Sequence, residues 1–249
     1  MTYTPGHTTN ASAFMAKRTL ASHGQFFRDF LDSGCRVLDL GCGPGTLSVG
    51  IAERVHPGQV VGVDFGQSQI DLARQHAVDA RADNLEFTVT SCYQLPFGDA
   101  SFDRVFSHAL IEHLERPIDA LREAHRVLKP GGIIGICSPD VDGWLLAPTS
   151  AELKRAVDAY ADLQQRNGGD LRIGKKLGTL VQQVGFNEVA VSARYECYPS
   201  LDFIGEYLAL QLDRNGMPDH AQVIRSWSTQ PAGMFAQAWV AAIGRKTHW

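Results

Sequence analysis

The chain has 249 residues, of which 44% are hydrophobic, and 23 Lys and Arg against 27 Asp and Glu give a formal net charge of −4. This composition excludes intrinsic disorder for most of the chain, and the small negative charge provides no global basic field for nucleic acid or an anionic membrane. The five cysteines form no C-x-x-C pair and are odd in number, so we expect neither a metal site nor a disulfide framework.

The N-terminal part of the chain predicts helices and no targeting signal. Asn10 can cap a helix that carries Phe14 and Met15 on one face, and residues 26–31 form a second helical piece. The N-terminus has no apolar signal-peptide region, and no apolar run approaches the ~20 residues that span a bilayer. We therefore expect a cytoplasmic protein without a membrane partner.

From residue 36 onward, short apolar strands alternate with helices. The predicted strands are residues 36–40, 60–63, 85–89, 102–106 and 133–137. Helices are predicted between them, at about 47–55, 68–81 (with Ser68 and Asp71 as a capping box) and 117–128. Alternation of this kind predicts right-handed βαβ units and a mostly parallel sheet. Because ligands of such sheets lie outside the carboxyl ends of the strands, the residues that follow each strand are the candidates for function.

Beyond residue 140 the pattern is less regular. Helices are expected at about 149–167, where Thr149 and Glu152 frame the start, at 177–184 and at 201–227. Residues 189–195 and 239–243 are β-like. This region also holds many aromatic side chains outside the predicted sheet, among them Trp144, Tyr195, Tyr198, Phe203, Tyr207 and Trp227.

The strongest local signal is the segment Val37–Thr46, V-L-D-L-G-C-G-P-G-T. Gly41 and Gly43 allow the backbone to turn sharply and to approach a ligand closely. The helix that begins near Thr46 directs its free N–H groups and positive dipole end toward that ligand. The G-x-G-x-G spacing departs from the G-x-G-x-x-G dinucleotide fingerprint, which disfavours an NAD-linked oxidoreductase. A tight turn without a ligand is the alternative, and three glycines with a proline in five residues disfavour it.

Asp64 ends the second predicted strand, 21 residues after Gly43. An acidic side chain at this place can accept hydrogen bonds from both hydroxyls of a ribose. Taken alone, Asp64 could equally be a solvated residue that caps a helix. Taken with the glycine segment, it favours ribose binding.

Residues 36–138 resemble the core of class I S-adenosylmethionine-dependent methyltransferases, and they are most similar to the group that includes the ubiquinone and menaquinone C-methyltransferases. The resemblance rests on Val37–Thr46, Val60–Ile70, Leu95–Asp103 and Leu121–Gly132. It implies an α/β, Rossmann-like fold with a mostly parallel seven-stranded sheet, helices on both faces and a helical cap. It also implies S-adenosylmethionine as the cofactor.

The same resemblance implies a domain plan. The whole chain, 1–249, is one methyltransferase domain. Its parts are N-terminal cap helices at 1–34, a cofactor-binding core at 35–140, substrate cap insertions at 141–185 and 198–231, and terminal strands at 186–197 and 235–245.

For the methionine part of the cofactor, the resemblance implies contacts from the backbone of Gly41, Cys42 and Gly43, with Asp39 supporting this loop. Ser107 follows the fourth strand beside the methionine. Arg18 reaches the cofactor's carboxylate from the N-terminal helix or is simply solvated.

For the adenosine part, the resemblance implies ribose binding by Asp64 and packing of Phe65 beside the adenine, with Gln69 on its other side. The loop Ser91-Cys92-Tyr93 surrounds the adenine edge. The family usually has an acidic residue where Ser91 stands. Ser91 can still accept a hydrogen bond, but without a charge.

His108 and His113 are the candidate catalytic residues. A histidine near its unperturbed pKa of ~6.5 can accept a proton from a hydroxyl or an amine at neutral pH. Each has a plainer alternative, which is packing or a cofactor contact, and Asp140 is a weaker third candidate. After the fourth strand the chain has no Asn/Asp-Pro-Pro-aromatic motif, no Pro-Cys nucleophile and no metal-binding aspartate. By the same resemblance, these absences disfavour methylation of an exocyclic or amide nitrogen, cytosine C5 chemistry and a catalytic metal.

The function that we expect is methyl transfer to a small, largely apolar molecule. The aromatic side chains of the cap suit a flat organic acceptor, and the cations are too scattered for a phosphate backbone. A nucleic-acid methyltransferase and a cofactor-binding protein without transfer activity remain as alternatives. The acceptor atom, the acceptor's identity and the oligomeric state stay open.

Overall fold

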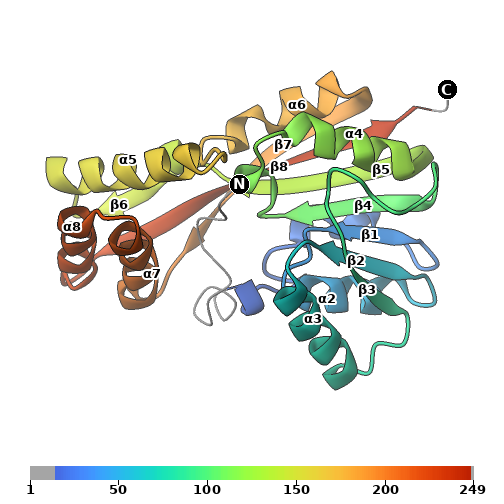
Figure 1. Ribbon diagram of the computed structural model, residues 1–249, viewed down its shortest axis with the longest axis horizontal. Helices are drawn as coiled ribbons and strands as arrows, with labels where there is room; N and C mark the ends of the chain where they lie inside the picture. Colours follow the sequence, from blue (N-terminus) through green and yellow to red (C-terminus); the bar gives the residue numbers. More distant parts are fainter. Residues whose placement is uncertain (1–14, 248–249) are drawn as a thin grey trace.

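The computed structural model describes residues 15–247 of the chain (Figure 1). The helix predicted from Asn10 through Phe14 lies outside the described residues. The described residues form eight strands. They are β1 (Val37–Leu40), β2 (Val60–Asp64), β3 (Leu85–Val89), β4 (Phe102–His108), β5 (Leu128–Pro139), β6 (Leu145–Ala147), β7 (Phe186–Cys197) and β8 (Met234–Lys246).

The helices separate these strands along the chain. The α-helices are α2 (Thr46–Val55), α3 (Gln67–Asp79), α4 (Pro117–Val127), α5 (Ala151–Arg166), α6 (Leu177–Gln183), α7 (Leu201–Arg214) and α8 (Pro218–Ser228). Four short 3-10 helices are η1 (Gln25–Phe30), η2 (Ile111–His113), η3 (Val141–Gly143) and η4 (Gly174–Lys176).

All strands belong to one mixed sheet. Strands β3, β2, β1, β4 and β5 are neighbours in this order and run parallel. Strand β8 pairs antiparallel with β5, and it also pairs with β6 and β7. The fold is therefore the predicted mostly parallel α/β sheet, with eight strands in place of seven. The additional strand, β6, has only three residues and forms because the long β8 extends past the end of β5.

Helices cover both faces of the sheet. On one face, α4 buries Ala120, Leu121, Ala124 and Val127, which recur at helical spacing, against β1, β4 and β5. On the other face, α2 buries Leu47, Ile51 and Val55 with part of α3. The parallel register places the carboxyl ends of β1, β2, β3 and β4 at one edge of the sheet, so that the loops after them meet there.

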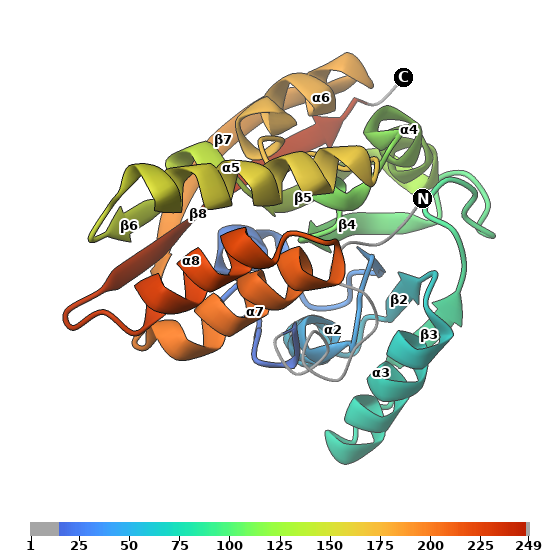
Figure 2. The ribbon, with the colours of Figure 1, turned by 60° about the vertical axis from the view of Figure 1, so that its left-hand side comes forward.

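The cap is a third layer with its own apolar core. Figures 1 and 2 show α5, β6, α7 and α8 gathered around the N-terminal end of β8. Apolar side chains from α5, α7 and α8 pack together with Phe235 of β8, and Trp227 is buried among them. The ion pairs of Arg225 with Glu206 and Asp213 join α8 to α7. The predicted helix over 201–227 is thus a pair of antiparallel helices broken at Gly216, whose φ is +73°.

Two predicted helix starts differ in detail. Helix α3 begins at Gln67 without a side-chain cap, and the Ser68–Asp71 capping box does not form. For α5, the capping side chain is Ser150, whose Oγ accepts from the backbone N–H of Leu153.

We predict that Gly135→Ala destabilises the protein. Gly135 lies in β5, and a Cβ atom there would come within 2.2 Å of the Phe27 ring of η1. Overpacking of this kind lowers the free energy of unfolding by about 1–3 kcal/mol. Urea denaturation measures it, with Gly98→Ala as the control, because the nearest atom to a Cβ at Gly98 is 3.7 Å away. Equal loss in both variants would contradict the packing argument.

Candidate cofactor and acceptor site

The glycine segment turns away from β1 through three left-handed residues. Gly41, Gly43 and Gly45 have φ of +77°, +52° and +77°, a region that other residues adopt only with strain. A Cβ at Gly43 would meet nothing closer than the Met15 sulfur at 3.7 Å. The glycine therefore leaves open space above its backbone, and a ligand can approach it.

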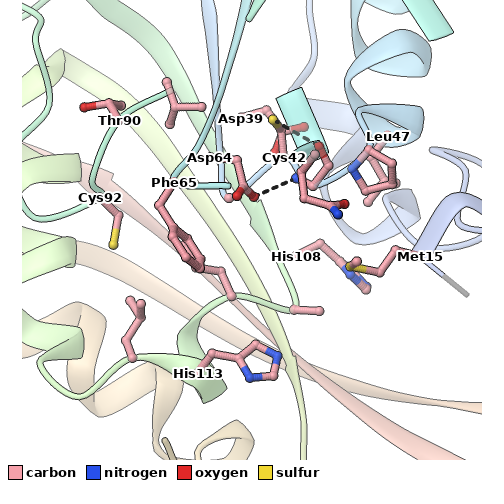
Figure 3. A pocket seen from close by; sticks show the side chains of 18 of the residues that line it. Met15, Asp39, Cys42, Leu47, Asp64, Phe65, Thr90, Cys92, His108 and His113 are labelled. Carbon is pink, nitrogen blue, oxygen red and sulfur yellow. Dashed lines mark hydrogen bonds between the residues drawn. The ribbon is translucent and has the colours of Figure 1, made fainter. Parts of the chain in front are cut away.

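The Asp64 carboxylate holds two backbone segments together. One oxygen accepts from the N–H of Gly43 at 3.0 Å (Figure 3), and the other accepts from the N–H of Gly66 at 2.9 Å. The carboxylate thus lies between the glycine segment and the start of α3. A carboxylate oxygen can accept more than one hydrogen bond, which is the chemistry that binding of a ligand hydroxyl requires.

Asp39 is buried directly beneath the glycine segment. The Ser48 hydroxyl of α2 donates a hydrogen bond of 2.5 Å to its carboxylate. Burial is the main cause that raises the pKa of Asp39 to about 7, and the negative charge of Asp64 adds to it. The interior therefore holds a carboxyl that titrates near neutral pH.

A cavity of about 320 Å³ lies at this edge of the sheet, and we call it the loop cavity. It is lined by Met15, Arg18, Asp39, Gly41, Cys42, Gly43, Pro44, Thr46, Leu47, Val63, Asp64, Phe65, Gln69, Thr90, Ser91, Cys92, Tyr93, His108, Ala109, Leu110, His113 and Leu114. Figure 3 shows Phe65, Thr90 and Cys92 toward one end, and Met15 and Leu47 toward the other. The Phe65 side chain is 58% exposed, unusual for a ring of this size.

Two of the residues named from the sequence, Ser107 and Asp140, do not line the loop cavity. Asp140 is buried, and its carboxylate accepts from the backbone N–H groups of Asp142 and Lys175 at 3.1 and 2.9 Å. Ser107 is buried, and its hydroxyl donates to the carbonyl of Leu40 at 2.8 Å. Neighbouring residues of a strand point to opposite faces of the sheet, so the side chains of Ser107 and His108 cannot both face the same cavity. The structure places His108 there and turns Ser107 into the sheet.

His108 is a buried ring without a hydrogen-bond partner among the described residues. It packs against Trp239 of β8, with ring centroids 4.5 Å apart, and against the edge of His23 at 5.2 Å. Burial, with smaller effects of Arg18 and His23, holds the pKa of His108 well below its usual value. The imidazole is therefore neutral, and both of its nitrogens are buried without a partner among the described residues, although the residue lines the loop cavity.

His113 is fixed in one tautomer by Gln164 of α5. The Gln164 amide nitrogen donates to the carbonyl of Glu112 at 2.9 Å and to Nδ1 of His113 at 2.7 Å. A carbonyl can only accept, so the amide nitrogen faces it, Nδ1 of His113 accepts, and the neutral ring carries its proton on Nε2. Burial also lowers the pKa of His113 to about 3. His113 is thus a hydrogen-bond donor and a poor base.

A smaller cavity of about 60 Å³, which we call the cap cavity, adjoins the loop cavity. Met15, Arg18, Ala109 and His113 line both. The other residues of the cap cavity are Glu112, Pro139, Trp144, Tyr160, Leu171, Ile204, Tyr207, Leu208, Gln237 and Trp239. Two of the cap aromatic residues singled out in the sequence, Trp144 and Tyr207, are therefore here, whereas Tyr195 is 53% exposed.

Sequence reasoning missed most of the cap cavity. Glu112 is the buried acid of this cavity, and Ser138 of β5 donates to it at 2.8 Å. Among residues 111–114, only His113 was a candidate from the sequence. Glu112 shares this cavity with side chains of α5 and α7, which begin 39 and 89 residues later in the chain. Gln237 and Trp239 reach the cavity through the pairing of β8 with β5.

Other kinds of site are absent from residues 15–247. They contain no group of three or more His, Cys, Asp or Glu side chains placed to hold a metal ion. Within the same range, every helix is too short or too polar to cross a membrane.

Comparisons with known proteins agree with this geometry. An uncharacterized methyltransferase of Schizosaccharomyces pombe is 36% identical over 133 residues, which are 51% of this chain and 47% of that protein. A demethylmenaquinone methyltransferase of Listeria monocytogenes is 35% identical over 118 residues, 46% of this chain and 50% of that protein. The chain spans about half the length of the curated relatives it matches.

The fold is also found among solved structures. A phosphoethanolamine N-methyltransferase of Haemonchus contortus, solved with phosphomonomethylethanolamine and S-adenosylhomocysteine, superposes with a TM-score of 0.58 at 19% identity. The match covers 87% of this chain and 49% of that one. A family model described as a methyltransferase domain matches residues 31–185 of this chain. The chain belongs to the class I S-adenosylmethionine-dependent methyltransferases.

Proposed function

We propose that the protein transfers a methyl group from S-adenosylmethionine to a small, largely apolar molecule. The observation that carries this proposal is the junction of two cavities. The loop cavity lies against the glycine segment, the cap cavity is enclosed by α5 and α7, and they share Ala109 and His113. A cofactor in the first cavity and an acceptor in the second would meet at these residues.

The loop cavity fits the cofactor in three respects. The open space above Gly43 accepts the methionine chain without a clash, and Asp64 offers carboxylate oxygens to the ribose hydroxyls. The exposed ring of Phe65 offers an apolar face for the adenine. The Listeria relative and the Haemonchus structure support the choice of cofactor, because the first is named a methyltransferase and the second holds S-adenosylhomocysteine.

When bound, S-adenosylmethionine supplies an electrophilic methyl group on a positively charged sulfur. The residues of this chain hold and orient the two molecules and exclude water. The glycine segment, Asp64, Phe65 and Gln69 hold the cofactor, as do Ser91, Cys92 and Tyr93. Arg18, whose guanidinium lies over the Trp239 ring at 5.1 Å, binds the cofactor's carboxylate, and Ala109 lies beside the methyl group.

We assign His108 to cofactor binding rather than to proton removal. Its neutral ring offers an N–H to the same end of the cofactor as Arg18, and its lowered pKa makes it a weak base. We predict that His108→Ala weakens S-adenosylhomocysteine binding by about 10-fold, as expected for one lost hydrogen bond. The neutral-pH region of the pH–rate profile should keep its shape. A profile that loses its acidic limb in this variant would restore His108 as the base.

The cap cavity and the paired cations support a small acceptor. The adjacent basic pairs beyond residue 129 are engaged in ion pairs: Lys176 pairs with Asp170 at 2.7 Å, Lys175 pairs with Asp142, and Arg245 pairs with Glu188 at 3.0 Å. A nucleic-acid enzyme needs a continuous basic groove. Apolar and aromatic side chains instead form most of the cap cavity wall.

We propose the cytoplasm as the compartment, residues 35–140 as the cofactor-binding core, and residues 141–185 with 198–231 as the acceptor cap. The boundaries fit the layers of the fold, since the cap core is drawn largely from the two insertions.

A labelled-methyl assay tests the proposed function. The purified protein is incubated with S-adenosylmethionine that carries a deuterated methyl group, together with either a bacterial small-molecule extract or total RNA. We expect the label in a product of low molecular mass. Label that appears only in RNA would favour the nucleic-acid class, and no transfer despite cofactor binding would favour a binding protein.

A further inference from the structure

We propose that Glu112 is a catalytic residue whose carboxylate takes the proton of a hydroxyl group on the methyl acceptor. This inference rests on the proposed function and adds the proton acceptor and the substrate class, a small hydroxyl compound. It replaces the two histidines in the role that the sequence suggested for them.

Glu112 lies where such a group is needed. It belongs to η2, directly after the loop that carries Ala109, and it lines the cap cavity beside the junction with the loop cavity. Its side chain is buried to all but 2%, and Ser138 donates to Oε2 at 2.8 Å. The other oxygen, Oε1, is 3.8 Å from Nε2 of His113, which is too long for a hydrogen bond.

The backbone of Glu112 is held from the cap side. Its carbonyl accepts from the Gln164 amide and from the N–H of Asp170 at 2.8 Å. A Cβ at Gly169 would come within 2.3 Å of this carbonyl, so the segment after α5 fits closely over it. The cap that encloses the acceptor therefore also fixes the acid, as a catalytic group requires.

Neither histidine of the site is suited to take the proton. Nδ1 of His113 already accepts from Gln164, and Nε2 carries the proton. His108 packs between Trp239 and His23 and is not among the residues that line the cap cavity. Glu112 is the carboxyl that lines the cap cavity.

The charged and titratable groups around Glu112 come from every element packed on it. They are Arg18, His113 of η2, Cys137 of β5, Tyr160 of α5 and Tyr207 of α7. Burial raises the pKa of Glu112 to about 7, and the hydrogen bond from Ser138 and the charge of Arg18 oppose this rise. A carboxyl in this range is ionised just above neutral pH and is basic enough to take a proton.

Charge favours a neutral hydroxyl over an ammonium as the acceptor. Arg18 lines both cavities, and the bound cofactor adds a positive sulfur at their junction. A third cation would be repelled in this enclosed space. A hydroxyl enters uncharged, and the tyrosine and tryptophan walls suit the apolar remainder of the molecule.

The proton transfer balances as follows. The O–H bond of the acceptor breaks, its proton passes to Glu112, and the electron pair stays on the oxygen. That oxygen bonds to the methyl group, and the sulfur keeps the electrons of the S–CH₃ bond. Glu112 returns its proton to water when the product leaves.

Phenol and aniline form a matched pair of probes, because they differ in the accepting atom and aniline is uncharged near neutral pH. We expect the wild type to methylate the phenol oxygen, with a rate that rises with pH through about 7. In Glu112→Gln, kcat for phenol should fall about 100-fold or more and lose this pH dependence. Any aniline methylation should change less than threefold, because the amine loses its proton only after transfer.

The stability of the cofactor-free protein distinguishes a catalytic role of Glu112 from a structural one. Between pH 5 and 8, the urea midpoint of the wild type should fall relative to that of Glu112→Gln, because the carboxyl keeps its proton up to about pH 7 in the native state but loses it near 4.5 in the unfolded state. The control is Glu115→Gln, an exposed residue of the same segment, which should follow the wild type in both assays. Equal loss of phenol and aniline methylation, a pH-independent midpoint difference, or no phenol methylation by a wild type that binds S-adenosylhomocysteine would each overturn the proposal. Absence of S-adenosylhomocysteine binding would instead refute the proposed function.

Discussion

Replacing Asp64 with alanine is expected to weaken S-adenosylhomocysteine binding by about 100-fold or more. Two ribose hydroxyls would lose a charged acceptor, and each such hydrogen bond contributes about 1.5–3 kcal/mol. The variant would also release the N–H groups of Gly43 and Gly66, which the carboxylate now holds. The glycine segment would therefore lose part of the geometry that the cofactor needs.

Isothermal titration measures this loss. Asp64→Asn keeps one oxygen acceptor and should give an intermediate affinity. Asp71→Ala is the matched control, because Asp71 lies seven residues further on, in α3, and its carboxylate is 60% exposed and pairs with Arg74. An unchanged affinity of Asp64→Ala would remove the ribose assignment.

The second large effect concerns stability rather than binding. Asp39→Asn should make the cofactor-free protein more stable than the wild type at pH 8, by about 2–4 kcal/mol. The pKa of Asp39 is about 7 in the native state, against 3.8 for the free side chain. The native state therefore binds more protons than the unfolded state between these values, and the wild type loses stability as the pH rises through them.

Urea denaturation at a series of pH values measures whether Asp39→Asn is more or less stable than the wild type. The difference between Asp39→Asn and the wild type should grow from pH 4 to 7 and then stay level. Asp103→Asn provides a control of opposite sign, because the hydrogen bond from Lys129 lowers the pKa of Asp103, so that its carboxylate stabilises the native state above its titration. A variant at Asp39 that is less stable than the wild type at pH 8 would show that this buried charge is compensated.

Local features explain why the loop cavity could be predicted from the sequence. The glycine segment, Asp64 and Phe65 lie within a few residues of strand ends, and the parallel order of the strands brings them to one edge. Each of the predicted cofactor and catalytic residues other than Ser107 and the third candidate, Asp140, lines this cavity, and their roles remain predictions. Ser107 differs because no local pattern in the sequence showed on which side of β4 its side chain lies.

The cap cavity depends on contacts that no local pattern shows. Glu112 is buried by α5 and α7, and Trp239 reaches His108 only because β8 runs antiparallel beside β5. The pKa of His108 and that of His113 are lowered by this same enclosure. Sequence reasoning assigned both an unperturbed imidazole and therefore named them as candidate bases, and it did not consider Glu112.

A crystal structure of the protein soaked with S-adenosylhomocysteine tests the central claim most directly. The account predicts the adenosine between Asp64 and Phe65, the amino-acid end above Gly43 near Arg18, and the sulfur beside Ala109 where the two cavities meet. A ligand with its sulfur turned away from the cap cavity, or a crystal that takes up NADH in the loop cavity and not S-adenosylhomocysteine, would contradict it.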